Sequence, residues 1–186
     1  MKKTSLLLTI ACLLLSGCIQ SPSNRPTSSF TPEEIAALCE VKRDDFIKLT
    51  SIETPKVRFW RENTIEIYRY WLSAEKTDGG SVGYFFTMNT QSSPSRGGAV
   101  LWQTAKDIEG TQFQFREKTW RFLSNDGVEE TVYIPLNRGY LEKIRDSKDP
   151  KLKWRVYNAR GWYVELDLDD NFAGGLLQRA DAVFGK

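Results

Sequence analysis

The chain has 186 residues, with 26 Lys and Arg against 24 Asp and Glu, and it contains no His. A nearly balanced charge creates no strong positive field for nucleic acid, and the absence of His excludes Ser-His-Asp and Cys-His catalytic centres and most zinc and copper sites. We therefore expect one domain with no nucleic-acid partner, no metal, no cofactor and no catalytic residues.

The first 17 residues have the pattern of a secretory signal. Lys2 and Lys3 precede an apolar run from Leu6 to Leu15, and the small residue Gly17 follows. The run is shorter than the roughly 20 residues that a permanent membrane-spanning helix needs. The pattern predicts export and removal of residues 1–17.

The residues Leu15-Ser16-Gly17-Cys18 resemble the lipobox of bacterial lipoproteins. The resemblance implies that Cys18 becomes the first mature residue and carries acyl chains such as palmitate, which hold the protein to a membrane. In this family an Asp after the cysteine favours the inner membrane. Ile19 at that position implies the outer membrane, facing the periplasm, more than the inner membrane.

Residues 18–30 are predicted to be the lipidated cysteine and a flexible tether, because they are polar and carry two prolines. The folded domain is predicted to span residues 31–186. Cys12 leaves with the signal and Cys18 is lipidated, so Cys39 has no partner for an intramolecular disulfide. Cys39 is interpreted as a buried, inert thiol or, alternatively, as an intermolecular bridge.

A helix is predicted to begin after Thr31, because Pro32 suits the first helical position and Glu34 completes a capping box. The helix is expected to run to about Glu40, or alternatively on through Phe46 and Leu49. From Lys56 onward the apolar residues recur with period two, which predicts strands.

The first long strand is predicted over residues 64–76, and the Asp-Gly-Gly turn after it leads into a second strand over residues 81–89. The first of these strands carries apolar residues on both faces, which is typical of a central strand covered on both sides.

Two aromatic pairs, Phe113 with Phe115 and Trp120 with Phe122, fall on opposite parities of one predicted strand segment. Because side chains alternate along a strand, a bend near residues 117–118 is needed to place the two pairs on one face. A further strand follows over residues 130–136.

The last third of the chain predicts a short helix over residues 138–146, a hairpin of residues 151–158 and 161–168, and a final helix capped by Asp170. Charges of opposite sign lie on the outer face of the hairpin and favour cross-strand pairing. These charged residues are Lys153, Arg155, Glu165 and Asp167. The pair Gly174-Gly175 predicts a close approach of the final helix to the sheet.

These elements predict an α+β fold in a single domain. An antiparallel β-sheet of about six to nine strands carries an N-terminal helix, a short internal helix and a C-terminal helix packed on the sheet.

Three patterns could carry chemistry. Residues 167–171 begin like a calcium-binding loop, but Phe172 occupies the required glycine position, so strand end and helix cap explain the acids better. Glu129 and Glu130 are adjacent and are expected on the solvated surface. Aromatic residues alternate with arginine in several predicted strands. This pattern is typical of sites that stack aromatic rings on a ligand, and it also occurs in ordinary core strands with the ring facing in and the arginine facing out.

The first place to look for a binding site is the two-sided strand, at Tyr68, Arg69, Tyr70 and Trp71. The core interpretation of these residues is preferred over the site.

The preferred function is that of a membrane-anchored, non-enzymatic envelope lipoprotein that binds another envelope protein as an accessory or assembly subunit. The alternative is a glycan- or peptidoglycan-binding module that uses exposed aromatic residues. An enzyme that relies on carboxylates or lysine is the least favoured class.

Lipidation gives the first testable prediction. Replacing Cys18 with Ser removes the sulfur that would carry the lipid, so labelled palmitate should be taken up by the wild-type chain and not by Cys18→Ser. The control is Cys12→Ser, which changes a cysteine inside the signal and should still be labelled. Label retained by Cys18→Ser would contradict the assignment.

Overall fold

The computed structural model describes residues 29–60, 67–92, 101–123, 127–147 and 151–185. The predicted signal, Cys18 and the tether up to residue 28 lie outside these residues. Within them the chain forms eleven strands and three helices, so the α+β fold is confirmed. No helix in this part of the chain is long and apolar enough to cross a bilayer.

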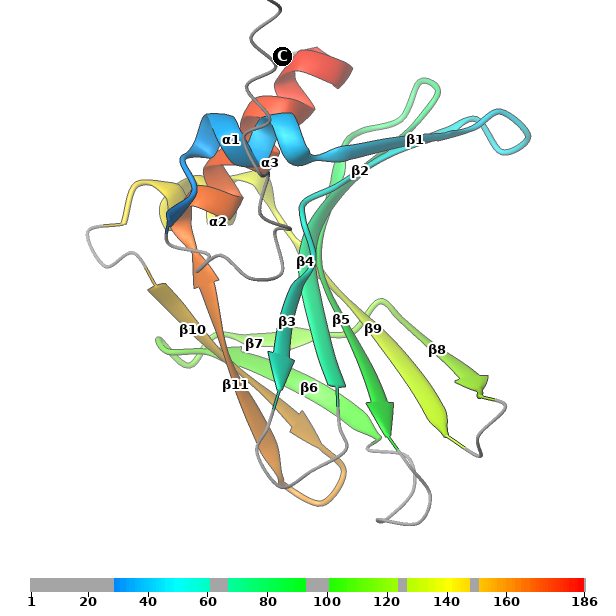
Figure 1. Cartoon of the computed structure of the whole chain (residues 1–186), viewed down its shortest axis with the longest axis vertical. Helices are drawn as coiled ribbons and strands as arrows, with labels where there is room; N and C mark the ends of the chain where they lie inside the picture. The colour runs from blue at the N-terminus through cyan, green and yellow to red at the C-terminus, as the bar shows by residue number, and fades with distance from the viewer. Residues whose placement is uncertain (1–28, 61–66, 93–100, 124–126, 148–150, 186) are drawn as a thin grey trace, which may run out of the picture.

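The strands form two antiparallel sheets instead of one. The seven-stranded sheet has the order β1 (Glu40–Asp44), β2 (Leu49–Glu53), β4 (Ile67–Thr77), β5 (Gly83–Ser92), β9 (Val128–Leu136) and β8 (Glu117–Phe122), with β3 (Val57–Trp60) also paired to β4. The four-stranded sheet has the order β11 (Tyr163–Asp169), β10 (Lys151–Asn158), β6 (Trp102–Asp107) and β7 (Gln112–Gln114). The two sheets enclose the core as a half-barrel (Figure 1).

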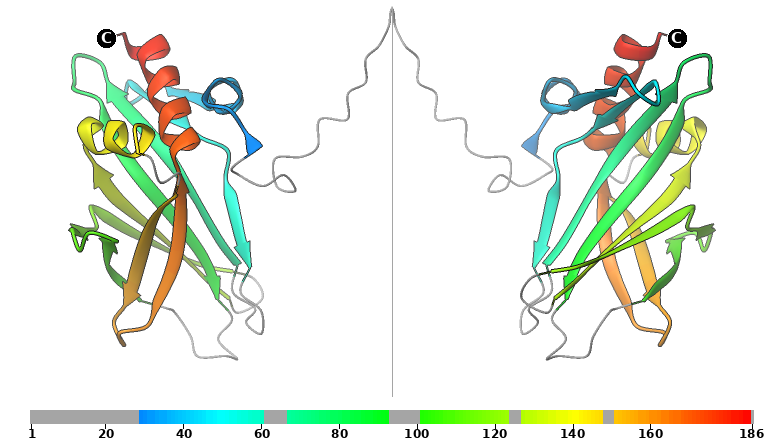
Figure 2. Two further views of the ribbon diagram at one scale, coloured as in Figure 1. Left: turned by 90° about the vertical axis from the view of Figure 1, so that its left-hand side faces the viewer. Right: turned by 90° about the vertical axis from the view of Figure 1, so that its right-hand side faces the viewer.

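The helices are α1 (Pro32–Leu38), α2 (Arg138–Arg145) and α3 (Asp170–Phe184). They gather at one end of the half-barrel, as the side views show (Figure 2). The predicted capping box of α1 is present: Glu34 N–H donates to Thr31 Oγ1 at 3.2 Å, and Thr31 N–H donates to Glu34 Oε2 at 2.9 Å. The cap of α3 is Asp169, one residue before the predicted Asp170.

Trp154 on β10 lies at the centre of the core and is fully buried. Its ring contacts Phe86 of the opposite sheet (centroids 5.2 Å apart), Phe113 of β7 (4.6 Å) and Tyr140 of α2 (5.7 Å). Aromatic pairs at such distances add about 0.5–1.5 kcal/mol each beyond their area burial. One side chain therefore joins both sheets and a helix.

At the bend predicted between the two aromatic pairs, the chain leaves one sheet and joins the other. β7 pairs with β6, whereas β8 pairs with β9, so the chain crosses between the sheets at residues 115–116, slightly before the predicted position. Arg116 N–H donates to Tyr133 O at 2.8 Å and fixes the crossing. Phe113 enters the core, but Phe122 is 85 % exposed.

Glu130 links the two sheets. The expectation that its carboxylate lies on the solvated surface is wrong. Glu130 is only 2 % exposed, on the inner face of β9. Its carboxylate accepts from Leu101 N–H at 3.0 Å and Trp102 N–H at 2.9 Å, where β6 begins. Burial raises the pKa of Glu130, and the two amides and the charge of Lys118 offset part of this effect.

The segment between α1 and β3 was expected to be helix or connection, and it forms the β1–β2 hairpin. Every residue of β1 is exposed, so its sequence Glu-Val-Lys-Arg-Asp has no apolar alternation to reveal a strand. Cys39, just before β1, is buried as expected. Burial raises the pKa of its thiol to about 11, against a smaller opposing effect of the Arg179 charge.

The Gly174-Gly175 pair allows α3 to approach α1, not the sheet as predicted. A Cβ atom at Gly175 would lie 2.5 Å from Ile35 Cγ2 and 2.8 Å from Pro32 O. At Gly174 the nearest atom, Pro32 Cβ, would be 3.3 Å away. The second glycine is therefore the one that the helix packing requires.

Gly175→Ala should destabilise the protein although alanine is the better helix former by about 1 kcal/mol. The new methyl group would overlap the Pro32 carbonyl oxygen, so α1 and α3 must separate. Gly174→Ala is the matched control, because its methyl group needs a much smaller adjustment. Thermal melts should show a lower Tm for Gly175→Ala than for Gly174→Ala, and the reverse order would contradict the packing described here.

Glu130→Gln should change how stability depends on pH. Because the folded pKa of Glu130 lies above the usual 4.5, its contribution to stability is complete below pH 4.5 and is lost as the pH rises through the folded pKa. The advantage of wild type over Glu130→Gln should therefore shrink with rising pH, by about 1.4 kcal/mol for each pH unit of the shift. Denaturant melts at a series of pH values from 4.5 upward would measure this advantage. Glu129→Gln is the control, because it also removes one carboxylate from β9. An advantage of wild type that grew with rising pH would contradict the assignment.

Candidate binding surfaces

Strand β4 separates the four residues that the sequence singled out. Tyr70 faces the core, whereas Trp71 lies on the opposite face beneath Lys56, whose Nζ is 4.5 Å from the ring centroid. Both rings are more than nine-tenths buried. Arg69 shares the parity of Trp71, and the side chain of Tyr68 lies outside the described residues. The structure does not bring these residues together on one exposed surface.

The space beside Tyr70 is too small for a ligand. Its volume is about 10 Å³, enough for roughly one water molecule. Burial raises the pKa of the Tyr70 hydroxyl, and the charges of Asp167 and Asp169 add to the rise. The hydroxyl is therefore neutral at physiological pH, as expected for a core residue.

The outer face of the four-stranded sheet is the better candidate. Strand pairing aligns Glu165, Arg155 and Lys106 in one row across β11, β10 and β6, and it aligns Tyr163 with Tyr157 in the next row. We call this surface the tyrosine face. It consists of Lys106, Lys153, Arg155, Tyr157, Tyr163 and Glu165.

The charges of the tyrosine face are partly paired. Glu165 accepts from Arg155 Nε at 3.2 Å and lies 3.5 Å from Lys153 Nζ, as the cross-strand charge pattern predicted. The hydrogen bond from Arg155 is the main cause that lowers the pKa of Glu165, with help from Lys153. Exposed pairs of this kind contribute little to stability, so they are free to exchange partners with a ligand.

Cationic side chains lie close to the aromatic rings of this face. The Arg155 guanidinium lies 4.9 Å from the Tyr163 ring centroid, and Lys106 Nζ lies 5.8 Å from that of Tyr157. The two tyrosine rings are 5.5 Å apart. Trp162, which precedes Tyr163 in the sequence, is 62 % exposed.

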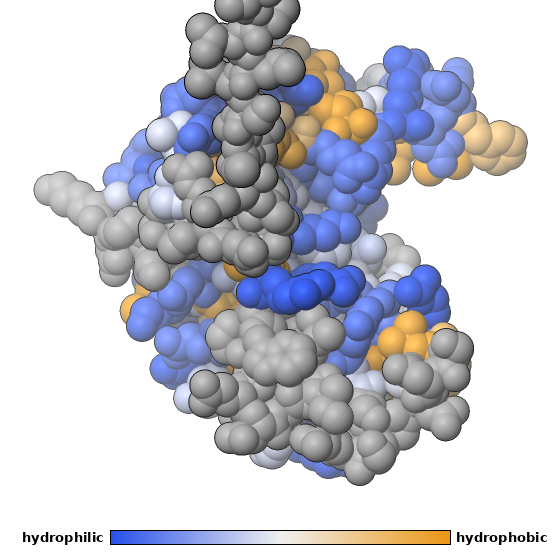
Figure 3. Space-filling view, in the orientation of Figure 1, coloured by the Kyte–Doolittle hydropathy of each residue, from blue (hydrophilic) through white to orange (hydrophobic). Residues whose placement is uncertain are grey.

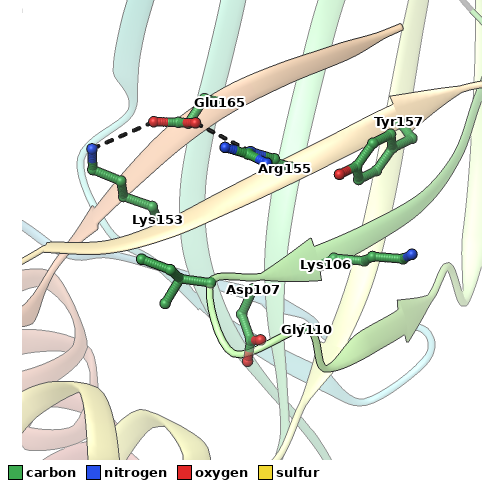
Figure 4. A pocket seen from close by; sticks show the side chains of 8 residues that line it. Lys106, Asp107, Gly110, Lys153, Arg155, Tyr157 and Glu165 are labelled. Carbon is green, nitrogen blue, oxygen red and sulfur yellow. Dashed lines mark hydrogen bonds and ion pairs between the residues drawn. The ribbon is translucent and has the colours of Figure 1, made fainter. Parts of the chain in front are cut away.

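A pocket of about 390 Å³ opens between this face and the turn that follows β6 (Figure 4). Asp107 lines its edge, but its carboxylate turns away and accepts from Thr111 N–H at 2.8 Å and Tyr140 Oη at 3.3 Å. Lys106, Arg155 and Lys153 therefore supply more positive than negative charge to the pocket. Pockets of a few hundred Å³ are the size that small ligands occupy.

The lining has the chemistry of a site for an anionic ligand. Cationic groups beside tyrosine rings suit a polar ligand that carries a carboxylate or a similar anionic group. The described lining contains no Ser, Thr or Cys nucleophile. Across the described residues, no three His, Cys, Asp or Glu side chains gather where they could hold a metal ion.

Strand β8 forms a second exposed surface, although its aromatic pair was expected to share one face with Phe113 and Phe115. β8 is the last strand of its sheet, and its Trp120 and Phe122 are 47 % and 85 % exposed. Leu123 N–H donates to Gly127 O, so by the alternation of an antiparallel ladder the N–H groups of residues 118, 120 and 122 point away from β9. We call this surface the β8 edge.

Comparison with models of known protein families, with curated proteins and with solved structures found no match.

Iodide quenching should separate the tryptophans into two groups. Trp71, Trp102 and Trp154 are buried and should be shielded, whereas Trp120 and Trp162 are exposed and should be quenched. The side chain of Trp60 lies outside the described residues and adds the same background to every variant. The double variant Trp120→Phe and Trp162→Phe should lose most of the accessible fluorescence, and an unchanged accessible fraction would contradict the described surface.

Proposed function

We propose that this chain is a lipid-anchored, non-enzymatic protein of the bacterial cell envelope that binds another envelope protein as an accessory or assembly subunit. The lipid on Cys18 would hold it on the periplasmic side of the outer membrane. The β8 edge is the observation that carries the choice of a protein partner.

The β8 edge offers both kinds of contact that strand addition uses. Its outward N–H groups are available to an extended segment of a partner, and Trp120 and Phe122 supply apolar anchors at alternate positions. Burying such side chains contributes about 1.5–3 kcal/mol each when they are fully covered. Exposed aromatic residues are also the residues that most often dominate the energy of protein interfaces.

The charge of the β8 edge favours an acidic partner segment. Lys118 is exposed and its Nζ lies 5.4 Å from the Phe115 ring centroid. Arg121 is also exposed, with its guanidinium 3.4 Å from Glu129. An acidic segment lying along β8 would complement both cations, which would help to fix its register.

Photocrosslinking in cells tests this proposal. A photoreactive residue at position 120 should form an adduct with one envelope protein, whereas the same residue at the exposed position 178 on α3 should not. Phe122→Ser, introduced beside the probe at 120, should reduce the adduct several-fold because it removes the second anchor.

A matched pair of variants tests strand addition itself. Lys118→Ala and Lys118→Pro both remove the cation, but only proline removes the outward N–H group. The adduct should therefore fall further for Lys118→Pro than for Lys118→Ala. An adduct that neither Phe122→Ser nor Lys118→Pro reduces would place the partner on another surface.

A glycan-binding module is the second candidate, and the pocket on the tyrosine face favours it. Exposed aromatic rings stack on sugar rings, and the cations Lys106 and Arg155 would pair with the carboxylates of peptidoglycan. In the iodide experiment, soluble peptidoglycan fragments would then protect Trp162 while leaving Trp120 accessible. Protection that Lys106→Ala abolishes would favour this candidate over the protein partner.

A further inference from the structure

The β1–β2 hairpin carries the most exposed apolar side chain among the described large hydrophobic residues. Phe46 is 97 % exposed and Ile47 is 56 % exposed, and both lie in the turn between the strands. The hairpin projects from the body near α1 (Figure 1), and its tip is apolar in the space-filling view (Figure 3). Neither surface proposed above uses this tip.

The turn is built to hold its apolar residues outward. Asp44 Oδ1 accepts from Phe46 N–H at 2.9 Å and from Ile47 N–H at 3.2 Å. Lys48 adopts the left-handed region (φ 52°), and its carbonyl accepts from Asp78 N–H at 3.1 Å in the neighbouring turn. Phe46 is therefore presented by a fixed turn.

The hairpin is stiffened below its tip. β1 pairs with β2 over five residue pairs, and β2 pairs in turn with β4 of the main sheet. Lys42 Nζ bridges Glu53 at 2.9 Å and Glu40 at 3.3 Å on the exposed side of these strands. Such a ladder resists folding of the tip back onto the body.

The end of the hairpin carries two exposed apolar side chains, Phe46 and Ile47, between the charged residues Asp45 and Lys48. Its two side chains present far less than the roughly 800 Å² per partner of a stable protein interface. The apolar region of a lipid bilayer would surround the tip and remove both side chains from water. A single protein pocket would have to enclose them from several sides to do the same. The shape therefore fits a lipid surface better than a protein pocket.

The charges near the tip agree with a lipid surface. Asp45 is paired with Arg43 Nε at 2.8 Å, and Asp44 is occupied by the two turn amides, so neither carboxylate faces the lipid unpaired. Lys48 forms no ion pair with any described residue and lies directly beside the apolar pair. Its ammonium group can reach the phosphates of lipid headgroups.

We propose that Phe46 and Ile47 insert into the headgroup region of the membrane that carries the lipid anchor. This inference rests on the anchor at Cys18 but not on which partner the protein binds. Two apolar side chains bind a bilayer weakly by themselves, so their effect depends on the anchor that keeps them close. The hairpin would then fix how the domain is oriented on the membrane and which surfaces face the periplasm.

Depth-dependent quenching tests the insertion with the lipidated full-length protein in vesicles. An environment-sensitive fluorophore on Asp45→Cys reports on the tip while keeping Phe46 and Ile47. Labelling is selective because Cys18 is blocked by lipid, and the buried Cys39 thiol, whose pKa is about 11, reacts slowly. The remote control is Arg160→Cys in the β10–β11 turn, at the opposite end of the molecule (Figure 1).

Lipids that carry a quencher near the headgroup should quench the label at 45 several-fold more than the label at 160. The matched variant with Phe46→Ser and Ile47→Ser should lose this difference while remaining on the vesicles. A label at 45 that iodide quenches and lipid quenchers do not would overturn the inference. A label shielded from iodide and also insensitive to lipid quenchers would indicate a protein pocket or a second copy, and this result would overturn it too.

Failure of the anchor has a different signature. The protein would then take up no palmitate and would not float with the vesicles, which would overturn both the proposed anchor and the insertion. Failure of the insertion leaves the protein afloat with an exposed label at 45.

Discussion

The burial of Trp154 is the constraint on which the arrangement of both sheets depends. Its indole is in contact with an aromatic residue from each sheet and with one from α2, so none of these layers can move independently of the others. A second link lies at the other end of β6, where the Glu130 carboxylate of one sheet accepts from the Leu101 and Trp102 amides at the start of β6, and Trp102 Nε1 donates to Thr90 Oγ1 at 2.9 Å. Apolar and polar links together set the angle at which the half-barrel closes.

Local signals predicted the helices and the last hairpin well. The capping box at Thr31, the apolar spacing of α3 and the opposed charges of β10 and β11 all act between residues close in sequence. The β1–β2 hairpin was missed because both faces of β1 are solvated, so no period-two pattern exists. Glu130 was misplaced because its partners, two backbone amides nearly thirty residues away, leave no trace in the sequence around it.

The candidate sites were harder to predict for a related reason. Tyr70 and Trp71 are neighbours in sequence, and strand alternation places them on opposite faces of the predicted two-sided strand, as the structure has them. Conversely, the tyrosine face depends on the register of three strands, and the exposure of Phe122 depends on β8 being the last strand of its sheet. Aromatic composition reveals neither register nor edge position, so only the assembled sheets distinguish a core ring from a surface ring.

The contact between α1 and α3 has a consequence for how the chain reaches its native state. The first helix packs against the last one, and the central Trp154 also lies late in the chain. A chain that crossed a membrane with its amino end leading would therefore expose the inner face of the seven-stranded sheet until residues 151–184 had emerged. High sequence separation between contacts slows folding. A chaperone would have its longest opportunity to bind during this interval, before the terminal helix completes the core.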